Sequence, residues 1–238
     1  MTFLKYNGDV IVMTTLIVIA SALMSFLTIG LFQLIGINIQ QFYFQNIVVF
    51  GLPAAPIFGT YLTQTNPQLV GKVSPVIARI FSPLVLIMLV VYLGAMAFSG
   101  KDPFNDREFL MLFNVLLIGV MAIIFFSIAE SSKNERKPVE MLVLFLLSIV
   151  TIVVNGIALS AILFRISEWG ITPNRLAIMG ANILILVNLV LVTLRLFKVV
   201  NRKADVAQVG KVIAAYLPVY FIWTVIVTFL FPLIFGFK

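Results

Sequence analysis

Histidine and cysteine are both absent from the 238-residue sequence. Their absence excludes His- and Cys-based zinc or haem sites, disulfides, thiol nucleophiles and every catalytic arrangement that depends on histidine. Charged residues are scarce at 11%, whereas soluble proteins average about a quarter. Hydrophobic residues reach 62%, above the soluble average of about half. This composition predicts a protein that lies in a lipid bilayer.

Seven apolar runs are long enough to cross a membrane, since a helix needs roughly 20 apolar residues to span about 30 Å of hydrocarbon. The runs lack the alternation typical of strands and are joined by short links. The first is expected to stay as a span, because no cleavage site follows it. We predict an all-α polytopic transmembrane bundle forming a single domain over 1–238. Its spans are predicted at 10–37, 45–64, 75–99, 108–130, 139–165, 174–199 and 211–236.

The basic residues are distributed unevenly between the two sides that seven spans define. Eleven lie with the N-terminus and the loops on its side, and five lie on the other side. The positive-inside rule therefore predicts a cytoplasmic N-terminus and an external C-terminus. The segment from Arg195 to Lys203 is expected to lie against anionic headgroups. The net charge of +7 is explained without a nucleic-acid partner.

The segment FRISEWGITPNR, residues 164–175, joins the fifth and sixth spans on the predicted external side. Gly170 is typical of a helix end, Thr172 of an N-cap and Pro173 of the first turn of a helix. These three residues indicate that the segment ends one helix and begins the next.

The charged and aromatic residues of the same segment leave two interpretations open. In the structural one, Trp169 lies at the headgroup level, while Arg165 and Arg175 extend to the interface or pair with Glu168. In the functional one, two arginines beside a helix N-terminus bind an anion or lipid phosphate. The candidate ligand-binding residues of this segment are Arg165, Glu168, Trp169, Asn174 and Arg175.

The run NGIALSAILFRISEWGITPNRLAIMGANILILVN, residues 155–188, resembles a bacterial family of multi-spanning membrane proteins catalogued as domain of unknown function 4153. The stretches NIVVFGLPAAPIFGTYL and DREFLMLFNVLLIGVMAI are also similar to that family, and the likeness extends over roughly 45–200. This resemblance implies a multi-pass protein of the bacterial inner membrane. It implies no known activity.

The second span contains GLPAAPIFG, in which Pro53 and Pro56 remove two backbone donors. We expect a broken helix at this point. Such breaks line binding sites in transporters, which makes both prolines candidate ligand-binding positions, and they also occur as plain kinks.

Four asparagines lie within apolar runs: Asn114, Asn155, Asn182 and Asn188. Ser148, Thr151 and Asn155 share one helical face, so we expect a polar seam among the fourth, fifth and sixth spans. Asn155 and Asn182 are candidate ligand-binding residues. Hydrogen bonding between helices is the alternative explanation.

The nine acidic residues all lie at or beyond the ends of the predicted spans, and this distribution disfavours an ion-coupled transporter. Asp102, Asp106 and Glu108 form the only carboxylate cluster suited to Mg²⁺ or Ca²⁺. Because Asp102-Pro103 is typical of a turn, we predict no metal site, no cofactor and no catalytic residue.

Three functions stay open. The first is a non-catalytic membrane component that binds lipid or a partner protein, which includes a second copy of the chain. The second is a facilitator or channel-like transporter with a site at the second span. The third is an intramembrane lipid-modifying enzyme.

The predicted orientation can be tested with reporter fusions at Lys238. We expect a reporter that is active only outside the cytoplasm to work there, because an odd number of spans places the two termini on opposite sides. A cytoplasmic signal from this position would contradict the span count.

Overall fold

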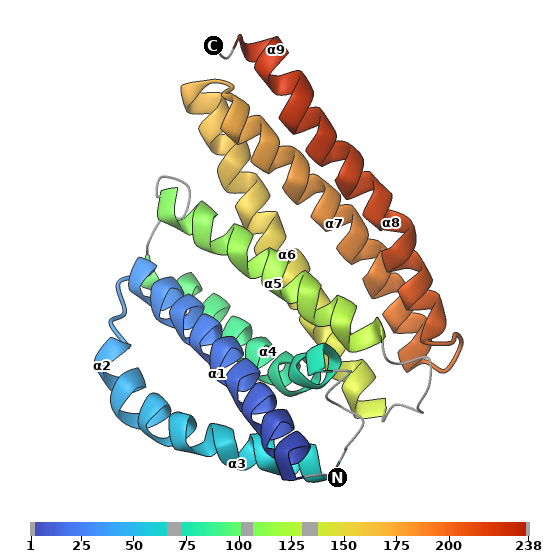
Figure 1. The fold of residues 1–238 in the computed structure, drawn as a ribbon. Coiled ribbons are helices and arrows are strands. Elements are labelled where there is room, and N and C mark those ends of the chain that lie inside the picture. The colour runs from blue at the N-terminus through green and yellow to red at the C-terminus, as the bar shows by residue number, and fades with distance from the viewer. Residues whose placement is uncertain (1–2, 66–72, 101–106, 130–137, 237–238) are drawn as a thin grey trace. The chain divides into compact units, whose positions relative to one another are not determined.

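The computed structural model describes residues 3–65, 73–100, 107–129 and 138–236. The described residues form helices and no strand (Figure 1). Within them, seven helical segments are long and apolar enough to cross a membrane. The predicted all-α polytopic bundle is confirmed. The contacts group into two compact units, Met1–Lys101 and Asp102–Lys238. That the chain forms one domain stays a prediction.

The first unit contains α1 (Phe3–Leu34), α2 (Gln40–Tyr43), the π-helical turn η1 (Phe44–Val48), α3 (Val49–Thr65) and α4 (Val73–Ser99). Helices α1 and α3 run antiparallel, with Met13 and Ile17 of α1 packed around Ala55 of α3. The amide of Gln64 donates to the hydroxyl of Tyr6 at 2.9 Å at one end of this pair.

Helix α1 differs from the predicted 10–37 span at both ends. It begins at Phe3 and contains 32 residues, which corresponds to a length of about 48 Å. Because this length exceeds the thickness of the hydrocarbon core, about 30 Å, the first turns of the helix can lie in the headgroup layer. It ends at Leu34, because Gly36 adopts a φ of 81° and Ile37 N–H bonds to Phe32 C=O at 3.0 Å. This pattern is a glycine-terminated Schellman motif. Asp9, which the prediction placed just before the first span, lies in the second turn of α1 and is 8% exposed.

The break expected at Pro53 and Pro56 is not present. Helix α3 continues through both prolines, because the fixed φ of proline is itself helical and each ring removes only one donor. The irregularity lies earlier, in η1, where Val49 N–H bonds five residues back to Phe44 C=O. A single π-helical turn takes the place of the predicted break.

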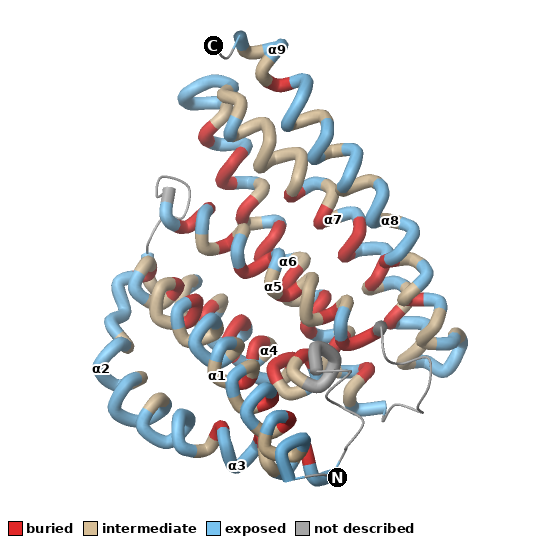
Figure 2. The backbone as a smooth tube through the Cα atoms, in the orientation of Figure 1, coloured by how far each residue is buried: buried red, intermediate tan, exposed pale blue. Residues whose placement is uncertain are grey.

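The second unit contains α5 (Arg107–Ala129), α6 (Pro138–Trp169), α7 (Pro173–Val200), α8 (Ala207–Val225), the π-helical turn η3 (Ile226–Leu230) and α9 (Phe231–Phe235). The antiparallel pair of α6 and α7 makes the most extensive contact. Leu110 of α5 joins this pair by packing with Ala161 and Ile162 of α6. The span that includes α8 is the least buried of the seven (Figure 2).

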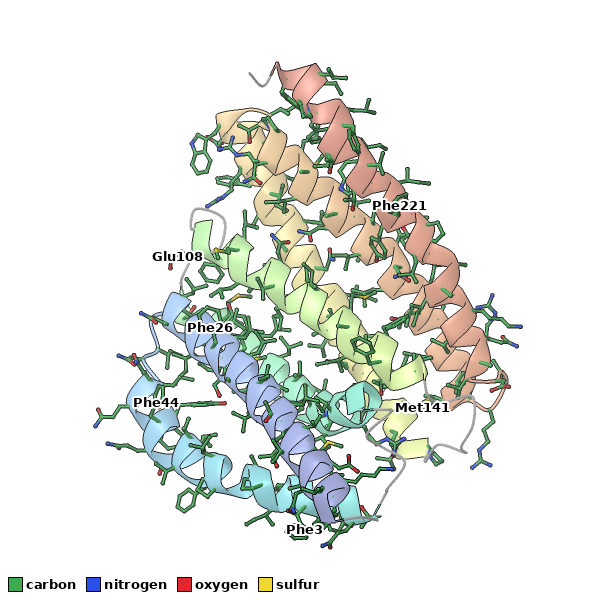
Figure 3. All side chains as sticks on the ribbon, in the orientation of Figure 1. Phe3, Phe26, Phe44, Glu108, Met141 and Phe221 are labelled. Atoms are coloured by element: carbon green, nitrogen blue, oxygen red, sulfur yellow. The ribbon has the colours of Figure 1, made fainter. Side chains whose placement is uncertain are left out.

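Large apolar side chains cover much of the outer surface (Figure 3). Phe3 is 79% exposed and Phe221 is 71% exposed. In water such exposure would be unfavourable by about 25 cal/mol per Å² of apolar surface, whereas lipid tails accommodate it. The exposed apolar surface therefore agrees with a membrane location.

Helices α7 and α8 approach closely at Gly180, because the ring of Trp223 occupies the space that a Cβ atom would need. The indole N–H of Trp223 also donates to the backbone C=O of Ala177 at 3.3 Å. The absent side chain of Gly180 thus admits the tryptophan.

We expect Gly180→Ala to lower the free energy of unfolding by about 1 to 3 kcal/mol, because the added methyl group overlaps the ring of Trp223. Gly156→Ala is the matched control, since its Cβ would meet no atom within 4 Å, and it should be neutral or stabilising by up to about 1 kcal/mol. Detergent-induced unfolding followed by tryptophan fluorescence measures both. Equal stability of the two variants would contradict the close approach.

Candidate functional site

The segment between α6 and α7 folds as its sequence predicts. Helix α6 ends at Trp169, and Gly170 follows with a φ of 76° and an N–H bond to Ile166 C=O at 2.9 Å. Thr172 is the N-cap of α7, with its hydroxyl accepting from Arg175 N–H at 3.3 Å. Pro173 begins the helix. The predicted stop, turn and start are confirmed.

The side chain of Arg175 closes this turn. Its Nη1 donates to the backbone C=O of Trp169 at 3.0 Å and to that of Gly170 at 2.8 Å. The last carbonyls of a helix have no hydrogen-bond donor within the helix and carry partial negative charge. A guanidinium supplies both the N–H donors and a compensating positive charge. Arg175 therefore stabilises the end of α6 from the first turn of α7.

Two guanidinium groups lie beside the indole ring of Trp169. The Cζ atom of Arg165 is 5.7 Å from the ring centroid, and that of Arg175 is 5.6 Å away. Both distances fall within the range of cation–π attraction. Arg165 is buried at 8% exposure, whereas Trp169 is 52% exposed. We call Arg165, Trp169 and Arg175 the turn cluster.

The other two candidates in this segment are not members of the turn cluster. Glu168 and Asn174 are exposed. Among the described residues Arg175 forms no ion pair with Glu168, one of the two arrangements that the structural interpretation allowed. The reason for Arg175 is that its donors are directed to the carbonyls at the end of α6.

The polar seam connects α6, α7 and α8. The side-chain amide of Asn155 donates to the backbone carbonyl oxygen of Asn182 at 3.2 Å. The hydroxyls of Ser148 and Thr193 lie 2.9 Å apart across the same helix pair. Asn188 of α7 donates to the hydroxyl of Tyr220 in α8 at 3.0 Å.

The composition of the seam differs from the prediction in one helix. Asn114 of the fourth span is half-buried and makes no side-chain hydrogen bond within the described part of the protein. Tyr220 of the seventh span was missed, because tyrosine at an apolar position carries no pattern that identifies its partner. Asn155 lies ten residues before Arg165, or about 15 Å along α6, so the seam and the turn cluster are separate sites.

Three amide atoms of the seam are buried and have no hydrogen-bond partner among the described residues: Asn155 Oδ1, Asn182 Nδ2 and Asn188 Oδ1. The orientation of the Asn155 amide is fixed, because the backbone oxygen of Asn182 can only accept and must face Nδ2. A buried acceptor on α6 and a buried donor on α7 thus remain unpaired. Each such atom costs about 1 to 3 kcal/mol.

Pro53 and Pro56 belong to the first unit and take part in neither site. Pro56 lines an open hollow of ≈ 450 Å³ with Ile57, Thr60, Tyr61 and Gln64, and Pro53 is not among its lining residues. All five positions belong to α3, and Ile57 and Tyr61 are strongly exposed. The hollow is a feature of the outer surface of that helix. No observation supports a transport site at the prolines.

The proposed carboxylate cluster falls mostly outside the described residues, because Asp102 and Asp106 lie there. Glu108 is exposed at the start of α5. In the part of the protein that the structure describes, no group of three acidic residues is placed to hold a metal ion.

Comparison of the sequence with protein-family models, with curated proteins and with solved structures finds no match. The likeness to domain of unknown function 4153 stays an expectation from the residues.

The two buried asparagines of the seam provide a test of their unequal roles. We expect Asn155→Ala to cost about 0.6 to 1.7 kcal/mol, because it removes a hydrogen bond between helices. Asn182→Ala should cost less, because the acceptor is a backbone oxygen and the lost Nδ2 had no partner among the described residues. Unfolding in detergent measures the difference. A larger loss for Asn182→Ala would show that its side chain carries an essential contact.

Proposed function

We propose that this protein is a non-catalytic component of the bacterial inner membrane that binds an anionic phospholipid at the turn cluster. In this proposal the N-terminus is cytoplasmic and the turn between α6 and α7 lies on the external side. The distribution of basic residues supports that orientation, and the resemblance to domain of unknown function 4153 supports the membrane.

The observation that carries the proposal is the pair of guanidinium groups beside one half-exposed indole ring. Tryptophan is enriched at the headgroup level of membranes, where the phosphates of lipids lie. Guanidinium binds phosphate through parallel N–H donors. A phosphate beside Trp169 would lie close to the positive charge of both guanidinium groups.

Arg175 retains donors for a ligand while it caps α6. A guanidinium has five N–H groups, and two of them lie on Nη1, which contacts the carbonyls of Trp169 and Gly170. Nε and Nη2 carry the other three. At the start of α7, Pro173 has no N–H, and the N–H groups of Arg175 and Leu176 both bond to Thr172. The N–H of Asn174 adds a donor at the positive end of a 28-residue helix.

The other two functions gain less support. The facilitator depended on a broken second span, and α3 is continuous. The enzyme depended on Asp102 and Asp106, which lie outside the described residues. A partner protein or a second copy of this protein is kept as an outcome of the lipid experiment.

The proposal is tested by native mass spectrometry of protein released gently from its membrane. We expect the wild type to retain an anionic phospholipid and Arg165→Ala/Arg175→Ala to bind it about tenfold or more weakly. The reason is that each hydrogen bond to a charged group contributes about 1.5 to 3 kcal/mol.

Arg175→Lys separates binding from the structural role of the turn. Lysine keeps the charge but lacks the planar fork that reaches two carbonyls, so this variant should lose stability while it still carries lipid. Circular dichroism checks the fold of each form. Equal lipid occupancy in wild type and double variant would contradict the proposal, and wild type that appears only with a second protein would favour a partner.

A further inference from the structure

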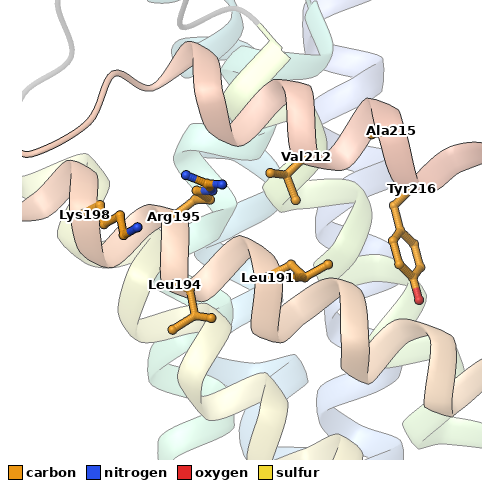
Figure 4. A pocket seen from close by; sticks show the side chains of 7 residues that line it. All are labelled: Leu191, Leu194, Arg195, Lys198, Val212, Ala215 and Tyr216. Atoms are coloured by element: carbon orange, nitrogen blue, oxygen red, sulfur yellow. The ribbon is translucent and has the colours of Figure 1, made fainter.

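A second candidate site lies between α7 and α8, at the other end of α7 from the turn cluster. The hollow here has a volume of ≈ 340 Å³ (Figure 4). This lies at the lower end of the range for ligand pockets, about 300 to 1,000 Å³. Its lining residues are Leu191, Leu194, Arg195, Lys198, Val212, Ala215 and Tyr216. We call this hollow the basic pocket.

The basic pocket is polar at one end and apolar along its walls. Arg195 extends into the space between the two helices, Lys198 lies beside it, and Tyr216 lies at the opposite end (Figure 4). The walls between these ends are aliphatic. Leu194 and Ala215 are exposed at the outer surface, where lipid tails would lie.

Positive charge is concentrated around this end of α7 and α8. Residues 195–211 contain five basic residues, Arg195, Lys198, Arg202, Lys203 and Lys211, and one acidic residue, Asp205. The carboxylate of Asp205 accepts from Ala207 N–H at 3.2 Å at the start of α8. Among the described residues, neither Arg195 nor Lys198 forms an ion pair.

The spacing along α7 places the basic pocket at the depth of lipid headgroups. Arg195 follows Arg175 by 20 residues in one helix, which corresponds to a rise of about 30 Å. The hydrocarbon core of a bilayer has about the same thickness. When Arg175 lies at the headgroup level of one leaflet, Arg195 reaches that level in the other.

We propose that the basic pocket binds one anionic phospholipid. Arg195 and Lys198 contact its phosphate, and the first carbons of an acyl tail lie along Leu191, Val212 and Ala215. A free phosphate ion would use the two cations but leave the aliphatic walls uncovered. This site shares no residue with the turn cluster and does not depend on the function proposed for it.

The test compares two double variants that each remove two positive charges from the same basic segment. Arg195→Gln/Lys198→Gln changes the lining of the basic pocket, and Arg202→Gln/Lys203→Gln changes exposed residues outside it. Affinities for phosphatidylglycerol and phosphatidylcholine are measured in detergent by native mass spectrometry. A parallel titration with inorganic phosphate separates a lipid site from a phosphate site.

We expect the pocket variant to lose at least about tenfold in phosphatidylglycerol affinity, since each basic residue near anionic lipid strengthens binding roughly fivefold. The outer variant should lose less than about threefold. Equal losses of affinity in the two double variants, or equal affinity for phosphatidylglycerol and phosphatidylcholine, would overturn the proposal. Binding of inorganic phosphate without binding of phosphatidylglycerol would also overturn it.

A third variant tests the contact with the acyl tail without any change of charge. Ala215→Phe fills the apolar part of the basic pocket at an exposed position, where the fold should tolerate it. We expect it to weaken phosphatidylglycerol binding severalfold while circular dichroism stays unchanged. Full retention of affinity would show that only the two cations bind and would contradict the lipid pose.

Discussion

Backbone N–H and C=O groups cannot remain unpaired in hydrocarbon, and the helices and helix ends of this protein depend on that constraint. In the part of the protein that the structure describes, seven span-length helical segments form most of these bonds within themselves. The exceptions occur where a helix ends or a proline interrupts the ladder. At the end of α6 the guanidinium of Arg175 donates to two carbonyls, and a π-helical turn, η1, precedes the two prolines of α3. A second π-helical turn, η3, comes just before Pro232. The Arg175 side chain thus supplies hydrogen bonds that the end of α6 cannot form within its own helix.

The antiparallel pair of α6 and α7 combines three kinds of polar contact. Thr172 caps the start of α7, Arg175 caps the end of α6, and Asn155 bonds across the pair. Because lipid tails are as apolar as leucine, such helices gain little from hydrophobic burial alone. Close packing and polar contacts must hold them, and the most extensive helix contact among the described residues also carries the bonds of Asn155 and of Ser148 with Thr193.

The sequence was sufficient for features that depend on neighbouring residues. Span number follows from hydropathy, and Gly170, Thr172 and Pro173 define the turn through their own backbone preferences. It was not sufficient for features that depend on the rotation of one helix against another. Gly180 and Trp223 are 43 positions apart, and only the packed structure shows that the missing Cβ admits the ring. The same limit applies to Asn188 with Tyr220 and to Arg175, whose alternatives of snorkelling or pairing with Glu168 omitted the carbonyls it contacts. Pro53 and Pro56 were misjudged because removal of a donor was equated with a break.

Helix α7 relates the two candidate lipid sites by its length. Positive charge at Arg175 and at Arg195 is separated by about one hydrocarbon thickness, and none of the residues between them is charged. A helix with cations at both ends resists displacement along the membrane normal, because either shift would bring a guanidinium into hydrocarbon. Bound phosphates at the two ends would strengthen this effect by pairing each cation at its own leaflet. Helix α8, which packs against α7, is largely exposed and has few buried residues. A lipid in the basic pocket would add contacts between α7 and the least buried of the seven spans.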